Sequence, residues 1–167
     1  CAVAPGDLRQ VRVSLTLGVS RYMAALAESA ACLRIFGDTL NPDEITKLLG
    51  GEPTYVALKG QTFTSKAGRT RTAKTGTWQY TATRATPGDL DAQVCEILEQ
   101  LTNDKQTWLE LSETYEIDLF CGFFMEETNE GMTISPETVR NLAQRNVEIL
   151  FEIYAPIEDE SSSHGDA

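Results

Sequence analysis

The fold is decided by residues 30–51, which read AACLRIFGDTLNPDEITKLLGG. In the first part of this stretch Leu33 and Ile35 lie on either side of Arg34. Because successive side chains of a strand point to opposite faces, this alternation predicts a strand over residues 30–36. One face of that strand is apolar and the other is partly polar, as in a sheet that is buried on one side only.

A helix is predicted directly after this strand. The segment Asn41-Pro42-Asp43-Glu44 offers an N-cap side chain, a proline at the first helical position and two acids in the first turn. The glycine pair Gly50-Gly51 is a typical helix end. A second start of this kind is Ser135-Pro136-Glu137, so we expect another helix there.

Similar patterns continue along the chain. They predict further strands over residues 53–59, 77–83, 117–125, 132–134 and 147–154, an exposed loop or hairpin over 60–76, and helical pieces after Asp89 and around Trp108. The resulting β-α-β units predict one α+β domain, with a mostly antiparallel sheet and helices packed on one face in a ferredoxin-like arrangement.

The domain is expected to cover residues 30–156. Residues 157–167 are polar and acidic, which predicts a disordered tail. Residues 1–29 are interpreted as an N-terminal extension. Since the sequence opens with Cys1 and Met23 precedes the first strand, residues 1–22 are expected to be upstream translation or a disordered arm.

The charge balance favours a basic partner. The formal net charge is −11, which repels nucleic acid and anionic membranes at long range, although acidity also simply keeps a protein soluble. The four cysteines include no C-x-x-C pair, and those at Cys32 and Cys121 stand in apolar runs, so packed thiols in a reducing compartment are expected. The sequence contains no run of about 20 apolar residues, the length that a membrane-spanning helix needs. These features favour the cytoplasm.

Several of these motifs, taken in order, resemble one family. They are residues 33–38, 41–50, 52–54, 59–60, 76–78, 117–124, 135–137 and 152–154. Over about residues 30–155 the chain resembles the Domain of Unknown Function 4279 family of small bacterial proteins. The resemblance implies a one-domain bacterial protein, with some members near toxin systems, and it implies no established activity.

The sequence offers little for catalysis. The single histidine, His164, lies in the expected tail, so histidine-based mechanisms and most zinc sites are disfavoured. Neither the P-loop nor the dinucleotide-binding glycine pattern follows a strand. We therefore expect no catalytic residue, no metal site and no cofactor.

One segment is basic in this acidic chain. No Asp or Glu occurs from Pro53 to Gly88. The candidate binding residues in this segment are Lys59, Lys66, Arg69, Arg71, Lys74, Trp78 and Arg84, with Phe63 and Tyr80 nearby. Basic and aromatic residues together are typical of sites for phosphate or single-stranded nucleic acid. The favoured alternative is a solvated hairpin whose charges balance acids elsewhere in the fold.

A second candidate is a polar face shared by three strands. By alternation, Arg34, Asp118, Glu148 and Glu152 share one side of the sheet if their strands are neighbours. Carboxylates beside an arginine could carry acid–base chemistry or bind a cation. Ion pairs that only stabilise a partly wet sheet are the more common outcome, and we favour them.

These observations rank three functions. The leading hypothesis is a non-enzymatic interaction protein of the bacterial cytoplasm, of immunity type, that binds a basic partner or toxin. The first alternative is a module that binds phosphate ligands or single-stranded nucleic acid through residues 59–84. The second alternative is a carboxylate-dependent hydrolase that uses Asp118, Glu148 or Glu152. The sequence leaves the oligomeric state open.

Overall fold

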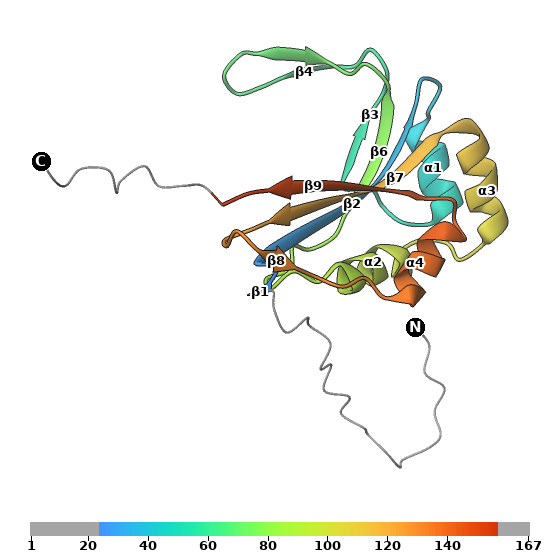
Figure 1. Cartoon of the computed structure of the whole chain (residues 1–167). Coiled ribbons are helices and arrows are strands. Elements are labelled where there is room, and N and C mark those ends of the chain that lie inside the picture. Colours follow the sequence, from blue (N-terminus) through green and yellow to red (C-terminus); the bar gives the residue numbers. More distant parts are fainter. Residues whose placement is uncertain (1–23, 157–167) are drawn as a thin grey trace, which may run out of the picture.

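The computed structural model describes residues 24–156 of the chain, arranged around a five-stranded sheet (Figure 1). The order across the sheet is β3-β6-β2-β7-β9. These strands are β3 (Tyr55–Ala57), β6 (Gly76–Thr81), β2 (Glu28–Gly37), β7 (Glu116–Phe124) and β9 (Glu148–Tyr154). All neighbours are antiparallel except β7 and β9, which are parallel. The predicted α+β domain with a mostly antiparallel sheet is therefore confirmed.

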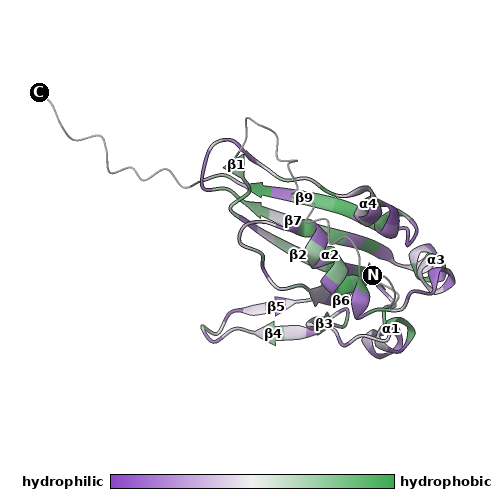
Figure 2. Ribbon diagram, turned by 90° about the horizontal axis from the view of Figure 1, so that it is seen from below, coloured by the Kyte–Doolittle hydropathy of each residue, from purple (hydrophilic) through white to green (hydrophobic). Residues whose placement is uncertain are grey.

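The helices lie on one face of this sheet (Figures 1 and 2). They are α1 (Pro42–Leu49), α2 (Leu90–Glu99), α3 (Lys105–Thr114) and α4 (Pro136–Ala143). The predicted caps hold the ends of two of them. The Asn41 side chain accepts a hydrogen bond from the Asp43 N–H, Gly50 ends α1 with a φ of 83°, and Ser135 Oγ accepts from the Thr138 N–H. These side chains satisfy backbone donors that the first turn of a helix leaves unpaired.

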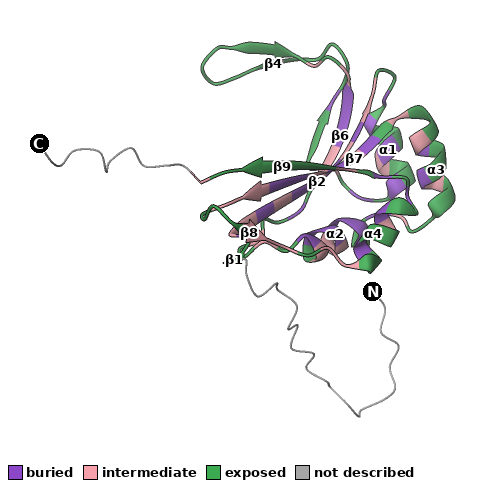
Figure 3. Ribbon diagram, in the orientation of Figure 1, coloured by how far each residue is buried: buried purple, intermediate pink, exposed green. Residues whose placement is uncertain are grey.

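The core lies between the helices and the inner face of the sheet (Figure 3). Leu33 and Ile35 of β2 are fully buried there, as the alternation predicted. Burying a side chain of this size contributes about 1.5–3 kcal/mol. Trp78 of β6 is also fully buried, and its indole N–H donates to Thr46 Oγ1 of α1 at 3.0 Å. Apolar burial and a satisfied indole together fix α1 on the sheet.

Two small two-stranded pieces complete the fold. The strands β4 (Thr62–Thr64) and β5 (Thr70–Thr72) form an antiparallel hairpin, as expected for the segment after β3. The strands β1 (Ala24–Ala25) and β8 (Glu130–Gly131) pair in parallel. The predicted strand over 132–134 is wrong, because Met132 and Ile134 pack against the core without joining a ladder. Met132 and Ile134 are apolar because they are partly buried, and the short ladder of β8 with β1 ends just before them at Gly131.

The folded unit begins earlier than the expected boundary at residue 30. Leu26 is buried and Ser29 is fully buried, where its hydroxyl donates to Gln93 Oε1 at 2.8 Å. The expectations for residues 1–22 and for the tail at 157–167 lie outside the described residues. Within residues 24–156, each helix is too short or too polar to cross a bilayer.

Candidate binding surface on the open sheet face

The sheet has a second face that the helices do not cover, and we call it the open face. It is formed by the even-numbered positions of β2, β7 and β9 and by the odd-numbered positions of β3 and β6. Along β2 these positions are half-buried while the alternate positions up to Ile35 are buried. The open face is therefore the broad surface on which polar and apolar side chains can meet a ligand.

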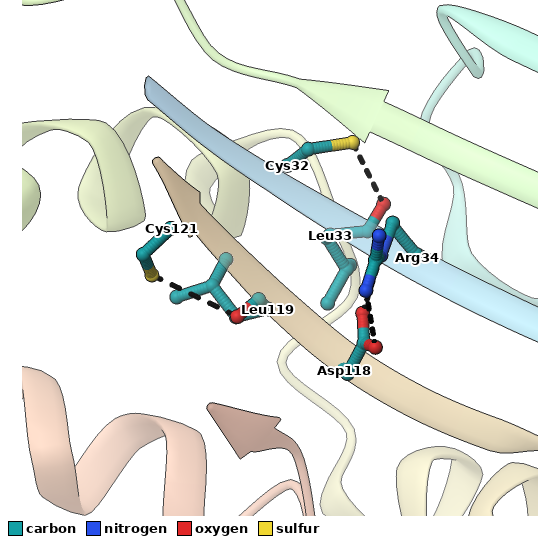
Figure 4. Close-up of polar contacts among 6 residues, drawn as sticks. All are labelled: Cys32, Leu33, Arg34, Asp118, Leu119 and Cys121. Atoms are coloured by element: carbon teal, nitrogen blue, oxygen red, sulfur yellow. Dashed lines mark hydrogen bonds and ion pairs between the residues drawn. The ribbon is translucent and has the colours of Figure 1, made fainter. Parts of the chain in front are cut away.

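An ion pair occupies the middle of the open face (Figure 4). Arg34 of β2 lies directly opposite Asp118 of β7 in the ladder, and its guanidinium donates two hydrogen bonds to the carboxylate at 2.7 and 2.6 Å. Both side chains are 22% exposed. Hydrogen bonding to Asp118 raises the pKa of Arg34, although burial acts against this. Such a two-point contact is the geometry that arginine and carboxylate groups favour.

Two aromatic rings flank this guanidinium. The Cζ atom of Arg34 lies 5.3 Å from the ring centre of Phe36 and 4.9 Å from that of Phe120. Both distances are within the range of cation–π attraction. With its charge paired and its faces covered, Arg34 is held in one position and acts first as a structural element of the sheet.

More carboxylates surround the ion pair. Glu148 of β9 stands beside Asp118 in the parallel ladder, and Glu152 of the same strand contributes to the raised pKa of Arg34. Glu116 is exposed at the start of β7. Among residues 24–156, none of these three glutamates is ion-paired with a lysine or arginine. The structure thus brings together the four residues named from the sequence, and it adds Glu116.

Apolar groups lie next to these acids. Leu150 is 40% exposed on the open face. Tyr154 stacks on Phe124 with ring centres 4.7 Å apart, and its hydroxyl donates to Glu152. That hydrogen bond raises the pKa of Tyr154. The β7–β9 side of the open face therefore combines negative charge with exposed apolar area.

The basic residues do not form one patch, and two of them are already paired. Lys59 forms an ion pair with Asp38. Arg84 pairs with Glu28 and stacks over Phe124, beside β7 and away from the hairpin. These two side chains therefore balance acids of the fold, as expected if the basic charges of residues 59–84 pair with acids elsewhere in the chain.

Trp78 was named as a ligand-binding residue, and this is wrong. It is fully buried in the core on the helix side of β6, because the odd-numbered neighbours of position 78 face the open side. Tyr80 follows the same parity and packs against the core. Aromatic content near a basic loop does not predict exposure when the residues belong to a strand.

The remaining basic residues lie on or next to the β4–β5 hairpin. Lys66 and Arg69 are exposed in its turn, and Arg71 and Lys74 border a groove of about 520 Å³ between the hairpin and the sheet. The other residues that line this groove are Phe36, Tyr55, Ala57, Phe63, Thr72, Ala73, Thr75, Thr77 and Gln79, and none of these is acidic.

Sequence reasoning placed Leu150 and Tyr154 on the same face as Glu148 and Glu152 without naming them as site residues, and it missed Glu116. Alternation along β7 and β9 places Glu116 with Asp118, and Leu150 and Tyr154 with Glu152. The same alternation, extended two residues back from Asp118, would have identified Glu116. Tyr55 of the groove could not have been found in this way, because it depends on how the hairpin folds back beside β3.

The thiols of neighbouring strands are packed groups. Burial raises the pKa of Cys121 to about 12 and also raises the pKa of Cys32, which receives a hydrogen bond from the Thr81 hydroxyl. In the described part of the chain, no cluster of three His, Cys, Asp or Glu residues is arranged to hold a metal ion.

Comparison with known proteins gives one match. A family model described as Domain of unknown function (DUF4279) matches residues 27–156. Neither a curated protein nor a solved structure matches the chain.

Proposed function

The chain belongs to this family of unknown function, and from that premise we propose that it binds a basic protein segment on the β7–β9 side of its open face. The activity is non-enzymatic, and the biological role is that of an immunity-type protein that masks a basic toxin. One observation carries the proposal: three exposed glutamates that form no salt bridge within residues 24–156 lie beside exposed apolar side chains on an uncovered sheet face.

The chemistry of this surface selects its partner. Glu116, Glu148 and Glu152 offer acceptors for lysine and arginine side chains, while Leu150 and the Tyr154 ring offer apolar contact. Complementary charge speeds the encounter of two proteins and favours correct over incorrect partners. Apolar area in the centre of the contact then slows dissociation. A basic segment with alternating apolar residues satisfies both requirements.

A bacterial cytoplasmic location fits this role. Cys32 and Cys121 are both free thiols, which suits a reducing compartment. The net charge of −11 favours solubility and an encounter with a basic partner.

The carboxylates are less suited to hydrolysis. Both oxygens of Asp118 already accept hydrogen bonds from Arg34, so this carboxylate is part of a structural ion pair. Binding is therefore the function that this geometry supports best.

The test uses two labelled peptides, one of alternating lysine and valine and one of alternating glutamate and valine. Fluorescence anisotropy is expected to show binding of the lysine peptide only, and binding weakens as salt is added. Replacing Glu116, Glu148 and Glu152 together with glutamine removes three charges. At about 0.5 kcal/mol for each exposed pair, affinity falls about tenfold.

The matched control carries Glu44→Gln, Glu52→Gln and Glu113→Gln. These three glutamates are also exposed but belong to α1, the segment after it and α3. The control has the same net charge as the test variant, so it should keep most of the affinity. Equal loss in both variants, or equal binding of the two peptides, would remove the proposal. Protection of cells that co-express a neighbouring toxin gene then tests the immunity role.

A second candidate function rests on the groove under the hairpin. In the described part of the chain its lining includes Arg71 and Lys74 and no acidic residue, and the ring centres of Tyr55 and Phe63 lie 6.2 Å apart at its side. A planar base can stack on such rings while phosphate meets the cations. Nucleotides and short single-stranded DNA are the probes.

The chain is titrated at low salt with these probes, and the titration is repeated with the double variant Arg71→Ala and Lys74→Ala. Loss of binding in the double variant supports this second candidate. Lys59→Ala is the control, because Lys59 is exposed but already paired with Asp38 and does not line the groove. An absence of binding at low salt would eliminate the groove as a phosphate site.

A further inference from the structure

The two edges of the five-stranded sheet differ in protection. At one edge β3 has only three residues, and the chain continues from it into the β4–β5 hairpin. At the other edge β9 has seven residues, Glu148–Tyr154, and within residues 24–156 it pairs with β7 alone. Long edge strands without proline, lysine or a bulge attract another strand. β9 contains neither proline nor lysine, and its charged residues are Glu148 and Glu152.

The side chains of β9 remain exposed on both faces of the sheet. Figure 2 colours much of this strand hydrophobic, and Figure 3 shows it exposed along most of its length. On the inner face, Phe151 is 46% exposed and Ile153 is 68% exposed, because the helices do not extend over this end of the strand. Two large apolar groups in this position need a cover.

The backbone of β9 offers hydrogen-bonding groups at the edge. The Tyr154 carbonyl accepts from the Met125 N–H at 3.0 Å, so the backbone groups of Tyr154 face β7. In a strand the N–H and C=O of one residue point to the same side and alternate between neighbouring residues. The N–H and C=O groups of Ile149, Phe151 and Ile153 therefore point outward from the sheet.

The positions of the acids restrict how a second copy of β9 can pair with this edge. A two-fold antiparallel pairing that keeps all helices on one side is centred on a residue, and it pairs five or more residues of β9 only when that residue is Leu150, Phe151 or Glu152. The Leu150 centre places Glu148 opposite Glu152, and the Glu152 centre places Glu152 opposite its own copy. Like charges directly opposite each other destabilise a pair of strands. Only the Phe151 centre avoids this repulsion.

The Phe151 centre also pairs the outward backbone hydrogen-bonding groups of the β9 edge. It places Ile149 opposite Ile153, Leu150 opposite Glu152 and Glu148 opposite Tyr154. Ile149, Phe151 and Ile153 each supply one outward N–H and one outward C=O, and all of these groups find a partner in the second copy. The exposed apolar stripe on the inner face meets an identical stripe.

We propose that the chain forms a two-fold symmetric homodimer through antiparallel pairing of β9 with β9, centred on Phe151. The two five-stranded sheets then become one continuous sheet. Both open faces lie on the same side of it and form one wide surface. We expect this single-strand contact to be weak, with a dissociation constant on the order of micromolar.

The test is sedimentation equilibrium of the full chain at concentrations from about 1 to about 300 µM, a range that spans such a constant. A monomer–dimer equilibrium is expected. Leu150→Lys is the informative substitution, because it places a lysine opposite Glu152 twice in the dimer and should tighten it about fivefold. With a Leu150 centre the same substitution would oppose two lysines and weaken the dimer.

Ile153→Pro is the substitution that should weaken the dimer. Its missing N–H is an outward group, so the ladder with β7 is kept while two contacts between the copies are lost, and the dimer should weaken at least tenfold. The control is Leu58→Lys, which changes an exposed leucine just after β3 at the other edge. Circular dichroism checks that each variant is folded.

The results distinguish the alternatives. A monomer at every concentration overturns the inference. Weakening by Leu150→Lys overturns the register, and equal effects of Leu58→Lys and Ile153→Pro overturn the assignment to β9. Peptide binding by a monomeric chain would leave the proposed function standing while removing the dimer, so the two can fail separately.

Discussion

The ion pair at the centre of the open face can be tested by a double-mutant cycle. Arg34→Met keeps the length of the side chain and its contact with Phe36 and Phe120 but removes the positive charge. The Asp118 carboxylate, which is 22% exposed in the native chain, then loses its guanidinium partner while Glu148 stays next to it. Asp118→Leu removes the other partner, and the double variant replaces the pair with apolar groups.

The expected magnitude follows from the burial of the pair. Breaking an exposed pair costs about 0.2–1 kcal/mol, and breaking a buried pair costs about 3–5 kcal/mol. Arg34 and Asp118 lie between these limits, so Arg34→Met should lower the free energy of unfolding by about 2 kcal/mol. Arg34→Met with Asp118→Leu should return to within about 1 kcal/mol of the native chain, because no charge is left unpaired.

Urea unfolding monitored by tryptophan fluorescence measures these values, since Trp78 and Trp108 are both fully buried. The coupling energy between the two substitutions should be about 1 kcal/mol or more. Additive effects, or a stabilising effect of Arg34→Met alone, would refute the conclusion that the pair is a structural element of the sheet.

Three further outcomes are expected. Burial raises the pKa of Glu130, but hydrogen bonds from backbone N–H groups, including that of Ala27, lower it by more, so the pKa lies below its ordinary value of 4.5. The stability that Glu130 contributes is therefore present above pH 4.5 and is lost as the pH falls through the folded pKa. Glu130→Gln should flatten this part of the curve of urea stability against pH. Ser29→Ala leaves the buried Gln93 Oε1 without its donor and should cost about 1–3 kcal/mol in urea unfolding. With a pKa of about 12, the buried Cys121 thiol should resist iodoacetamide at neutral pH until urea is added, as mass spectrometry of its peptide would show.

Local chemistry explains the parts of the fold that sequence could predict. The Asn41 and Ser135 caps depend on atoms within three residues, and both helices start where the caps indicate. The faces of β2 follow from strict alternation around Leu33 and Ile35. The ion pair of Arg34 with Asp118 needed one further condition, that their strands are neighbours, and the ladder meets it.

Long-range geometry explains the rest. The parallel pairing of Ala24–Ala25 with Glu130–Gly131 joins segments far apart in sequence, and two residues give no pattern to detect. Trp78 was misplaced because the basic loop ends where a strand begins, and the parity of that strand turns the indole into the core. The groove beside Tyr55 depends on the direction of the hairpin, which no local motif encodes.

The most direct measurement of the proposed function is chemical-shift mapping of the isotope-labelled chain during titration with the lysine–valine peptide. We expect salt-sensitive shifts that cluster at the amides of β7 and β9 and reach Arg34, with little change in α1 to α4. Shifts confined to the helices, or none at low salt, would contradict binding on the open face.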